Sequence, residues 1–292
     1  HIFHRQAALA SVPIWGELEL AWRIRPKSGA AQWLCVTGTN GKTTTTLMLD
    51  SILRASGFRS EAAGNIGHSL VGVVMHDELD VIAVEVGAPQ LPFIHTVSPW
   101  ASVCLNLAPD HVDHFGDFDR YTKAKARIYE RTQYAAVYNG HDEATISMVE
   151  AADVIEGCRA IGFTRGIPAL SELGVVDNAL VDRAFIANRM DYAQELALVS
   201  DIHPAAEHNT ENALAAAAVA RAFGTLDSPD LNRVSPTAVQ MGLRNFAPGP
   251  HRNAVVASVD GVTYVDDSKA TNAHAADTSL SSYPSVIWIA GG

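Results

Sequence analysis

Residues 36–46 read Val-Thr-Gly-Thr-Asn-Gly-Lys-Thr-Thr-Thr-Thr, between the end of an apolar run and a helical pattern that begins near Thr44. A strand that leads through a glycine-rich turn into a helix forms an anion site, because unpaired backbone N–H groups and the helix dipole converge there. Lys42 adds a positive charge for phosphate oxygens, and the Thr43 hydroxyl can ligate Mg²⁺. The glycine spacing departs from the general phosphate loop, since Val36 stands where that loop has its first glycine and Gly38 lies closer to the lysine. The stretch predicts a nucleoside triphosphate site.

Composition limits the other classes of function. A chain of 292 residues favours two domains, and 48% hydrophobic against 18% charged residues favours packed α/β cores. The net charge of −11 and the lack of a basic stripe argue against nucleic acid binding. No apolar run is long enough for a membrane span. The three cysteines are isolated in the sequence, which is typical of reduced cysteines in a cytoplasmic protein. The chain starts at His1 without an initiator methionine, so we expect a fragment.

Short apolar runs alternate with helical patterns, which predicts βαβ units around a mostly parallel sheet flanked by helices, in an α/β fold of the P-loop type. The clearest strands are predicted at residues 33–37, 81–86, 102–107, 135–138 and 285–290. Helices are predicted at residues 44–56, at 119–132 with Asp119 as N-cap, and at 209–223. Residues 140–205 are weakly patterned, and the order of their elements is not predicted.

A second, Rossmann-like α/β domain is predicted to begin near residue 250 and to break off at the end of the chain. Residues 247–250 read as a linker, and Asp260-Gly261 between two apolar runs predicts a hairpin. A polar segment at 266–272 then leads into a further helix and strand.

Two polar features are expected at the C-terminal ends of strands, where α/β proteins place their sites. Gly64-Asn65-Ile66-Gly67 lets the backbone approach a ligand, although its composition alone favours an ordinary turn. Glu85 lies inside an apolar run, where a carboxylate is costly unless it is paired or metal-bound. A Mg²⁺ ligand is the favoured interpretation of Glu85, and a salt-bridged strand end is the alternative.

The residues alone do not decide the roles of three further features. Residues 110–114 read Asp-His-Val-Asp-His, which suits a Mg²⁺ site, a transition-metal site or a solvated loop, with His111 as the favoured ligand. Lys125 lies near other cations that can depress its pKa, but the pattern favours a surface lysine. Asn209 and Asn212 open a helix, and Asn209 alone fits an N-cap.

Taken in order, these motifs resemble the Mur ligase family of ATP-dependent, amide-bond-forming enzymes of peptidoglycan synthesis. The resemblance covers essentially the whole chain and includes residues 37–43, 64–67, Glu85, 110–111 and 121–130. The segment Asp267-Ser268-Lys269-Ala270-Thr271-Asn272 resembles the branch that adds D-glutamate to UDP-N-acetylmuramoyl-L-alanine. The resemblance implies an acyl phosphate formed by ATP on the muramoyl substrate and then attacked by the amine of D-glutamate.

The resemblance also implies roles for individual residues. The implied catalytic residues are Lys42, Glu85, His111 and Lys125. The implied ATP contacts are Gly38, Thr39, Asn40, Gly41, Lys42, Thr43, Thr44, Asn209, Asn212, Arg252 and Asp267. The implied ligands of two Mg²⁺ ions are Thr43, Glu85, His111 and Lys125 as a carbamate. The implied substrate contacts are Asn65, Gln90, Lys269 and Thr271.

The same resemblance implies a remnant of a uridine-nucleotide domain with its linker at 1–30, a central ATP-binding domain at 31–247 and a truncated amino-acid-binding domain at 248–292. We expect a cytoplasmic monomer, with little or no turnover from this chain because its substrate domains cannot close.

One departure keeps two alternatives open. Gly87, Ala88 and Pro89 stand where the D-glutamate-adding branch usually has two serines and a phenylalanine, and Gln90 is retained. The alternatives are a folylpolyglutamate-synthase-like ligase, which the 267–272 segment disfavours, and a nucleotide-binding protein without ligase activity.

Overall fold

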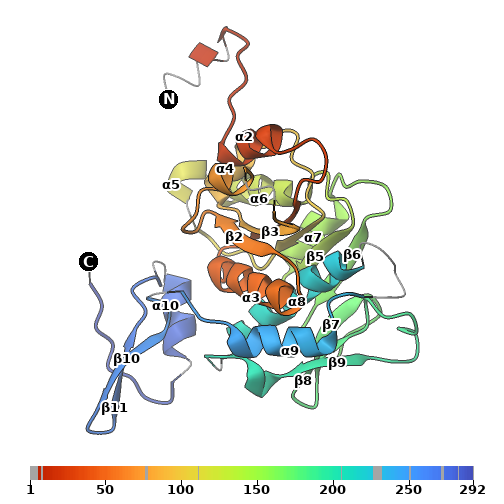
Figure 1. Cartoon of the computed structure of the whole chain (residues 1–292). Coiled ribbons are helices and arrows are strands. Elements are labelled where there is room, and N and C mark those ends of the chain that lie inside the picture. Colours follow the sequence, from red (N-terminus) through yellow and green to blue (C-terminus); the bar gives the residue numbers. More distant parts are fainter. Residues whose placement is uncertain are drawn as a thin grey trace.

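A nine-stranded sheet forms the centre of the molecule, with the order β2-β3-β1-β4-β5-β6-β7-β8-β9 (Figure 1). The computed structural model describes residues 6–7, 9–75, 78–110, 112–204, 206–225, 232–249, 251–270, 273–281 and 283–291. Pairing is parallel from β2 to β7 and antiparallel from β7 to β9, which confirms the predicted mostly parallel α/β sheet. The strands are β1 (Gln32–Thr37), β2 (Ser60–Gly64), β3 (Val81–Glu85), β4 (Ala101–Cys104), β5 (Ala135–Asn139), β6 (Arg159–Phe163), β7 (Glu172–Val176), β8 (Ala179–Asp182) and β9 (Gln194–Leu198).

Helices cover both faces of this sheet, because alternate side chains of each central strand point to opposite sides. From β1, Leu34 and Val36 join one buried cluster with α3, α8 and α9, while Trp33 and Cys35 join another with α2, α4 and α7. The helices of the main body are α2 (Glu17–Ile24), α3 (Lys42–Ala55), α4 (Leu70–Val73), α5 (Val112–Phe115), α6 (Phe118–Ala126), α7 (Glu143–Glu150), α8 (Glu207–Gly224) and α9 (Pro236–Asn245).

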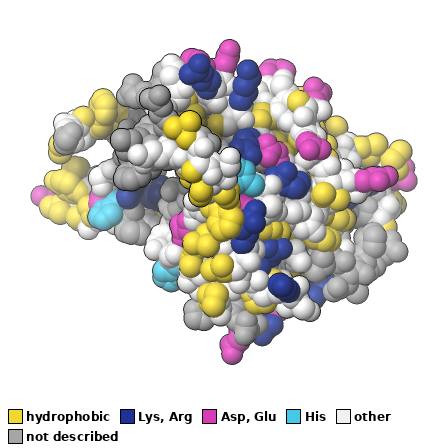
Figure 2. Space-filling model, turned by 90° about the horizontal axis from the view of Figure 1, so that it is seen from above, with side chains coloured by type: hydrophobic (Ala, Val, Ile, Leu, Met, Phe, Trp, Pro, Cys, Tyr) yellow, Lys and Arg dark blue, Asp and Glu magenta, His cyan; other side chains and the backbone are white. Residues whose placement is uncertain are grey.

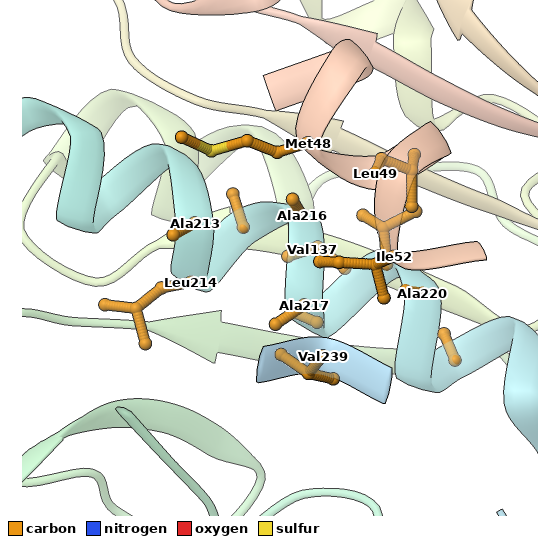
Figure 3. Packing of buried hydrophobic residues seen from close by; sticks show 14 of the residues in the cluster. Met48, Leu49, Ile52, Val137, Ala213, Leu214, Ala216, Ala217, Ala220 and Val239 are labelled. Atoms are coloured by element: carbon orange, nitrogen blue, oxygen red, sulfur yellow. The ribbon is translucent and has the colours of Figure 1, made fainter. Parts of the chain in front are cut away.

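Helix α8 is buried almost throughout its length and packs between α3 and the sheet. Residues 213–220 are six alanines, one leucine and one valine, and every one of them is inaccessible to solvent. Small side chains let the helix approach both the strands and Met48, Leu49 and Ile52 of α3 (Figure 3). This packing fixes the N-terminal end of α8 beside the start of α3.

Two helix starts differ from the sequence predictions. Helix α6 is capped by Asp117, whose Oδ1 accepts from the Arg120 N–H at 2.8 Å, so the predicted cap at Asp119 is wrong. The helix gives way to a 3-10 turn, Arg127–Tyr129, before residue 132. Helix α8 begins at Glu207, which places Asn209 inside the first turn and makes the N-cap interpretation of Asn209 wrong.

The C-terminal segment forms a separate two-stranded sheet of β10 (Ala254–Val259) and β11 (Val262–Asp266), followed by α10 (Ala273–Leu280). Val259 pairs with Val262 across Asp260 and Gly261, whose φ angles of 51° and 79° suit a tight hairpin turn and confirm that prediction. The predicted strand at 285–290 is wrong, because those residues pair with no strand in the part of the chain described.

The surface of this hairpin is apolar. It contributes exposed valines and Tyr264, and apolar side chains gather over this outlying segment at the left of Figure 2. Among the helices that the structure describes, none is long and apolar enough to cross a membrane.

Candidate functional site

Residues 38–41, which we refer to as the phosphate loop after the sequence motif, lie between β1 and α3, at the edge where the parallel strands end. Gly41 caps α3 with φ +82°, and a Cβ added there would lie 2.3 Å from Oδ1 of Asn212. The first intrahelical bond runs from the Thr45 N–H to the Gly41 carbonyl at 2.9 Å. The N–H groups of residues 41–44 therefore precede the helical hydrogen-bond ladder, which is the arrangement typical of anion sites at helix starts.

Asn106, just beyond β4, braces this loop. Its Oδ1 accepts from the Asn40 N–H at 2.9 Å and its Nδ2 donates to the Asn40 carbonyl at 3.2 Å. Its own carbonyl accepts from the Thr39 N–H at 3.0 Å. The sequence analysis missed Asn106, although an amide side chain directly after a buried strand was the available signal.

The loop residues Gly38 and Thr39 face the protein interior. A Cβ on Gly38 would lie 2.9 Å from Cβ of Leu105, so only glycine fits there. The Thr39 hydroxyl is 3.0 Å from the Tyr121 hydroxyl and accepts from the Ala108 N–H at 3.0 Å. Thr39 thus fixes the loop to the segment after β4 and to Tyr121 with its side chain.

Two buried amides of α8 support the loop from behind. Oδ1 of Asn212 accepts from the Thr45 hydroxyl at 3.1 Å, and its Nδ2 donates to Oδ1 of Asn209 at 3.2 Å. Asn209 in turn donates to the Pro204 carbonyl at 2.9 Å. The structure brings both residues to the predicted site, where their side chains hold one another and the start of α3.

The Lys42 side chain folds back over the loop. Its Nζ donates to the carbonyls of Gly38 at 3.0 Å and Thr39 at 2.9 Å. Burial lowers the pKa of Lys42, while the charges of Glu85 and Asp110 oppose that shift. The ammonium is therefore held at the loop with acidic groups in electrostatic range.

Glu85 ends β3 as a buried carboxylate with 2% exposure. Its Oε2 accepts from the Thr43 hydroxyl at 2.6 Å and its Oε1 from Nδ2 of Asn65 at 3.0 Å. Both donors are neutral, and no described lysine or arginine forms an ion pair with Glu85, which disfavours the salt-bridged alternative. One carboxylate thus joins the phosphate loop to the glycine-rich turn after β2.

The C-terminal segment also reaches this site. Nη2 of Arg252 donates to the Thr43 hydroxyl at 2.9 Å across more than 200 residues of sequence. Asp267 lies nearby, since its Oδ1 accepts from the Asn253 N–H at 2.9 Å and its charge raises the pKa of His208, which burial lowers. Lys269 is exposed on the next turn, with no described side-chain contact to the phosphate loop.

Lys125 of α6 is buried, at 1% exposure, so the pattern-based interpretation as a surface lysine is wrong. Its Nζ donates to the Gly38 carbonyl at 2.7 Å and to the Thr37 hydroxyl at 3.4 Å, and it lies over the Tyr121 ring. Burial lowers the pKa of Lys125 to about 7, with the Lys42 charge acting in the same direction. The i, i+4 spacing to Tyr121 carried a signal for this inward face, since both residues are buried.

The remaining predicted residues divide into three groups. Gln90 turns onto its own segment, where Oε1 accepts from the Gly87 N–H at 2.8 Å. Thr44 is half-buried on the first turn of α3. His111 and Thr271 lie outside the described residues, and within the described ranges no three His, Cys, Asp or Glu side chains gather as a metal site.

Comparison with known proteins shows to which family this chain is related. Residues 36–220 match the family model of the Mur ligase middle domain. The chain belongs to the Mur ligase family. This match includes the phosphate loop, Glu85, Lys125 and both α8 amides.

Similar Mur ligases include two that are named UDP-N-acetylmuramoylalanine–D-glutamate ligase. The protein of Streptomyces avermitilis is 56% identical over 98% of this chain and 59% of its own length. That of Thermobifida fusca is 49% identical over the same shares. The chain thus spans about three fifths of the length of these relatives.

Solved structures show the same fold. MurF from Acinetobacter baumannii matches with a TM-score of 0.65 and 22% identity, over 91% of this chain and 57% of that one. E. coli FolC in complex with DHPP and ADP matches with a TM-score of 0.60 and 19% identity, over 90% of this chain and 67% of that one. At such identities the likeness concerns the fold alone.

Proposed function

We propose that the protein containing this chain is an ATP-dependent ligase that adds D-glutamate to UDP-N-acetylmuramoyl-L-alanine through an acyl phosphate. The observation that carries the proposal is the bridge from Thr43 through Glu85 to Asn65. It joins a phosphate-binding loop to the turn that the family resemblance assigns to the muramoyl substrate. The names of relatives at 49% and 56% identity support this choice of substrates.

In this proposal the helix start holds the β- and γ-phosphates of ATP. The N–H groups at 41–44 are preorganised donors, since Asn106 and Asn212 already fix the loop from two sides. Lys42 supplies a positive charge, and its bonds to neutral loop carbonyls can be exchanged for phosphate oxygens. Arg252 and Asp267 bring the C-terminal segment to the nucleotide.

Two Mg²⁺ ions fit this proposal through different sets of ligands. The Thr43 hydroxyl and a Glu85 carboxylate oxygen, 2.6 Å apart, are hard ligands that suit the first ion. His111 and a carbamate on Lys125 are the proposed ligands of the second, because an uncharged buried amine can take up CO₂ and become a carboxylate-like donor. When bound, the ions offset negative charge that gathers between triphosphate and substrate carboxylate.

The substrate side of the proposal rests on fewer contacts. Asn65 and Gln90 are the proposed contacts of the muramoyl substrate, and Lys269 and Thr271 those of D-glutamate. We also propose the division into a linker at 1–30, an ATP-binding domain at 31–247 and the start of an amino-acid-binding domain at 248–292. The separate sheet of β10 and β11 supports the last boundary.

The deciding experiment measures phosphate release by the complete gene product with ATP, Mg²⁺ and UDP-N-acetylmuramoyl-L-alanine. We expect release that depends on D-glutamate and not on L-glutamate, with the amide product detected by mass spectrometry. Release that depends on a folate and L-glutamate would favour the folylpolyglutamate-type alternative. Nucleotide binding without release for any acceptor would favour the protein without ligase activity and contradict the proposal.

A further inference from the structure

The chain that follows β3 has an irregular backbone, which two prolines interrupt. We refer to residues 87–96 as the post-β3 segment. It contains a short 3-10 helix, Ala88–Phe93, in which Pro89 and Pro92 have no N–H to donate. The segment therefore lacks part of the hydrogen-bond ladder that fixes a regular helix, and its conformation depends on partners elsewhere in the chain.

Arg127, directly after α6, supplies two of these partner bonds. Its Nη1 donates to the Pro92 carbonyl at 2.8 Å and its Nη2 to the Ile94 carbonyl at 2.6 Å. The Glu130 carboxylate accepts from Nε of Arg127 at 2.9 Å and from Nη2 at 3.2 Å. Because the guanidinium is planar and rigid, these four hydrogen bonds fix its orientation. Arg127 thus ties the post-β3 segment to the end of α6.

Arg127 and Lys125 lie two residues apart and contact different parts of the candidate site. Nζ of Lys125 donates to the Gly38 carbonyl of the phosphate loop at 2.7 Å. Residues two apart on a helix differ by roughly 200° in direction, so their side chains leave the helix on different sides. The end of α6 therefore joins the phosphate loop to the post-β3 segment.

The start of the post-β3 segment borders the Glu85 carboxylate. A Cβ on Gly87 would lie 3.3 Å from Oδ1 of Asn65, whose Nδ2 donates to Glu85 at 3.0 Å. The far end of the segment is fixed separately, because Oε2 of Glu19 accepts from the N–H groups of residues 95 and 96 at 2.7 and 2.9 Å. Arg127 holds the part between this anchor and the site, so a loss of its bonds would displace the turn that packs against Asn65.

We propose that Arg127 is a positioning residue for the muramoyl substrate. It holds the post-β3 segment in place relative to Lys125, which keeps Asn65 and Gln90 beside Glu85. Arg127 acts through backbone carbonyls and is not itself assigned a contact with substrate. The inference rests on the proposed ligase function, since it concerns the binding of a substrate of that reaction.

The test is steady-state kinetics of the complete gene product with Arg127→Gln. We expect the KM for UDP-N-acetylmuramoyl-L-alanine to rise about tenfold, with kcat and the KM for ATP within about twofold of the wild-type values, because uniform binding of one substrate is lost. Arg127→Lys keeps the charge but not the forked donor geometry, so its KM should be intermediate. Hydrogen exchange of residues 87–96, measured without substrates, should be faster in Arg127→Gln.

Arg120→Gln is the matched control on the same helix. The Arg120 side chain is 72% exposed, and its ion pair with Asp117 is on the surface, so both KM values and the exchange rates should stay unchanged. If Arg127→Gln does not fold, Arg127→Lys decides by the same criteria.

Two kinds of failure are distinguishable. A wild-type protein without D-glutamate-dependent phosphate release refutes the proposed function. If the wild type shows that release, an unchanged muramoyl KM in Arg127→Gln, or equal rises in the KM values for both substrates, would overturn this inference alone. Unchanged hydrogen exchange of the post-β3 segment in Arg127→Gln would overturn it in either case.

Discussion

The low pKa of Lys125 predicts that this one lysine reacts with CO₂ at neutral pH. Burial is the main cause of its shift from 10.5 to about 7. At pH 8, a lysine with the ordinary pKa is about 0.3% neutral, whereas one with a pKa of about 7 is roughly 90% neutral. The uncharged amine, which is the form that attacks CO₂, is thus about 300-fold more abundant at Lys125 than at an exposed lysine.

The assay is ¹³C NMR of the protein equilibrated with ¹³C-bicarbonate. We expect one carbamate resonance that grows with a midpoint near pH 7 and is absent from Lys125→Met. Lys123→Met, at an exposed lysine on the same helix, should retain the resonance. In the complete gene product, Lys125→Met should lower ligase turnover by about 10²- to 10³-fold, the range for losing one group that stabilises charge in a reaction.

The same shift has a consequence for folding. Because the folded-state pKa lies below the unfolded one, the unfolded state binds more protons between about pH 7 and 10.5. The free energy of unfolding should therefore rise with pH over this window, and Lys125→Met should remove that rise while preserving the fold. A Lys125 resonance that titrates near 10.5, or no carbamate signal in a protein that binds nucleotide, would refute the reasoning.

Three further outcomes follow from single contacts. Gly41→Ala should destabilise the protein by about 1–3 kcal/mol in chemical denaturation and weaken nucleotide binding in calorimetry, because its positive φ is combined with a steric overlap. Gly57→Ala, with a similar φ and open space around it, should show a smaller loss; equal losses would contradict the overlap. At Glu19, burial acts to raise the pKa, but hydrogen bonds to the carboxylate outweigh it and lower the pKa to about 2. Up to about 3 kcal/mol of folding stability should therefore be lost as the pH drops from 4.5 towards 2. Glu19→Gln should abolish this acid dependence when denaturation is measured against pH. Asp182→Ala leaves the buried Arg221 without its 2.9 Å partner and should cost about 3–5 kcal/mol in the same denaturation assay, whereas a cost below 1 kcal/mol would show that water replaces the carboxylate.

The sequence predicted the elements whose patterns are local. The phosphate loop, the central strands and the hairpin at Asp260-Gly261 each depend on residues adjacent in the chain, and each is present. Residues 140–205 resisted prediction because β7, β8 and β9 are short and switch the sheet from parallel to antiparallel pairing. Such strands are defined by their partners rather than by their own periodicity.

The candidate site shows the same division between local and tertiary information. Gly41 and Thr43 follow from the loop pattern, but the role of Asn106 follows from β4 lying next to β1, which no local pattern encodes. Lys125 misled the local interpretation because charge alone favours exposure, whereas the tertiary structure covers its ammonium with the loop carbonyl of Gly38 and the Tyr121 ring.

The altered segment after Glu85 bears on whether the site is intact. The surroundings of Gly87 fit a glycine closely, because a Cβ there would lie 3.3 Å from both Oδ1 of Asn65 and Oε1 of Gln90. These two amides therefore pack against the space that glycine leaves, and Gln90 closes the turn by accepting from the Gly87 N–H. Asn65 meanwhile keeps its bond to Glu85. A segment that had drifted without selection for order would not be expected to retain this set of mutually dependent contacts, so the geometry favours an ordered turn over a degenerate one.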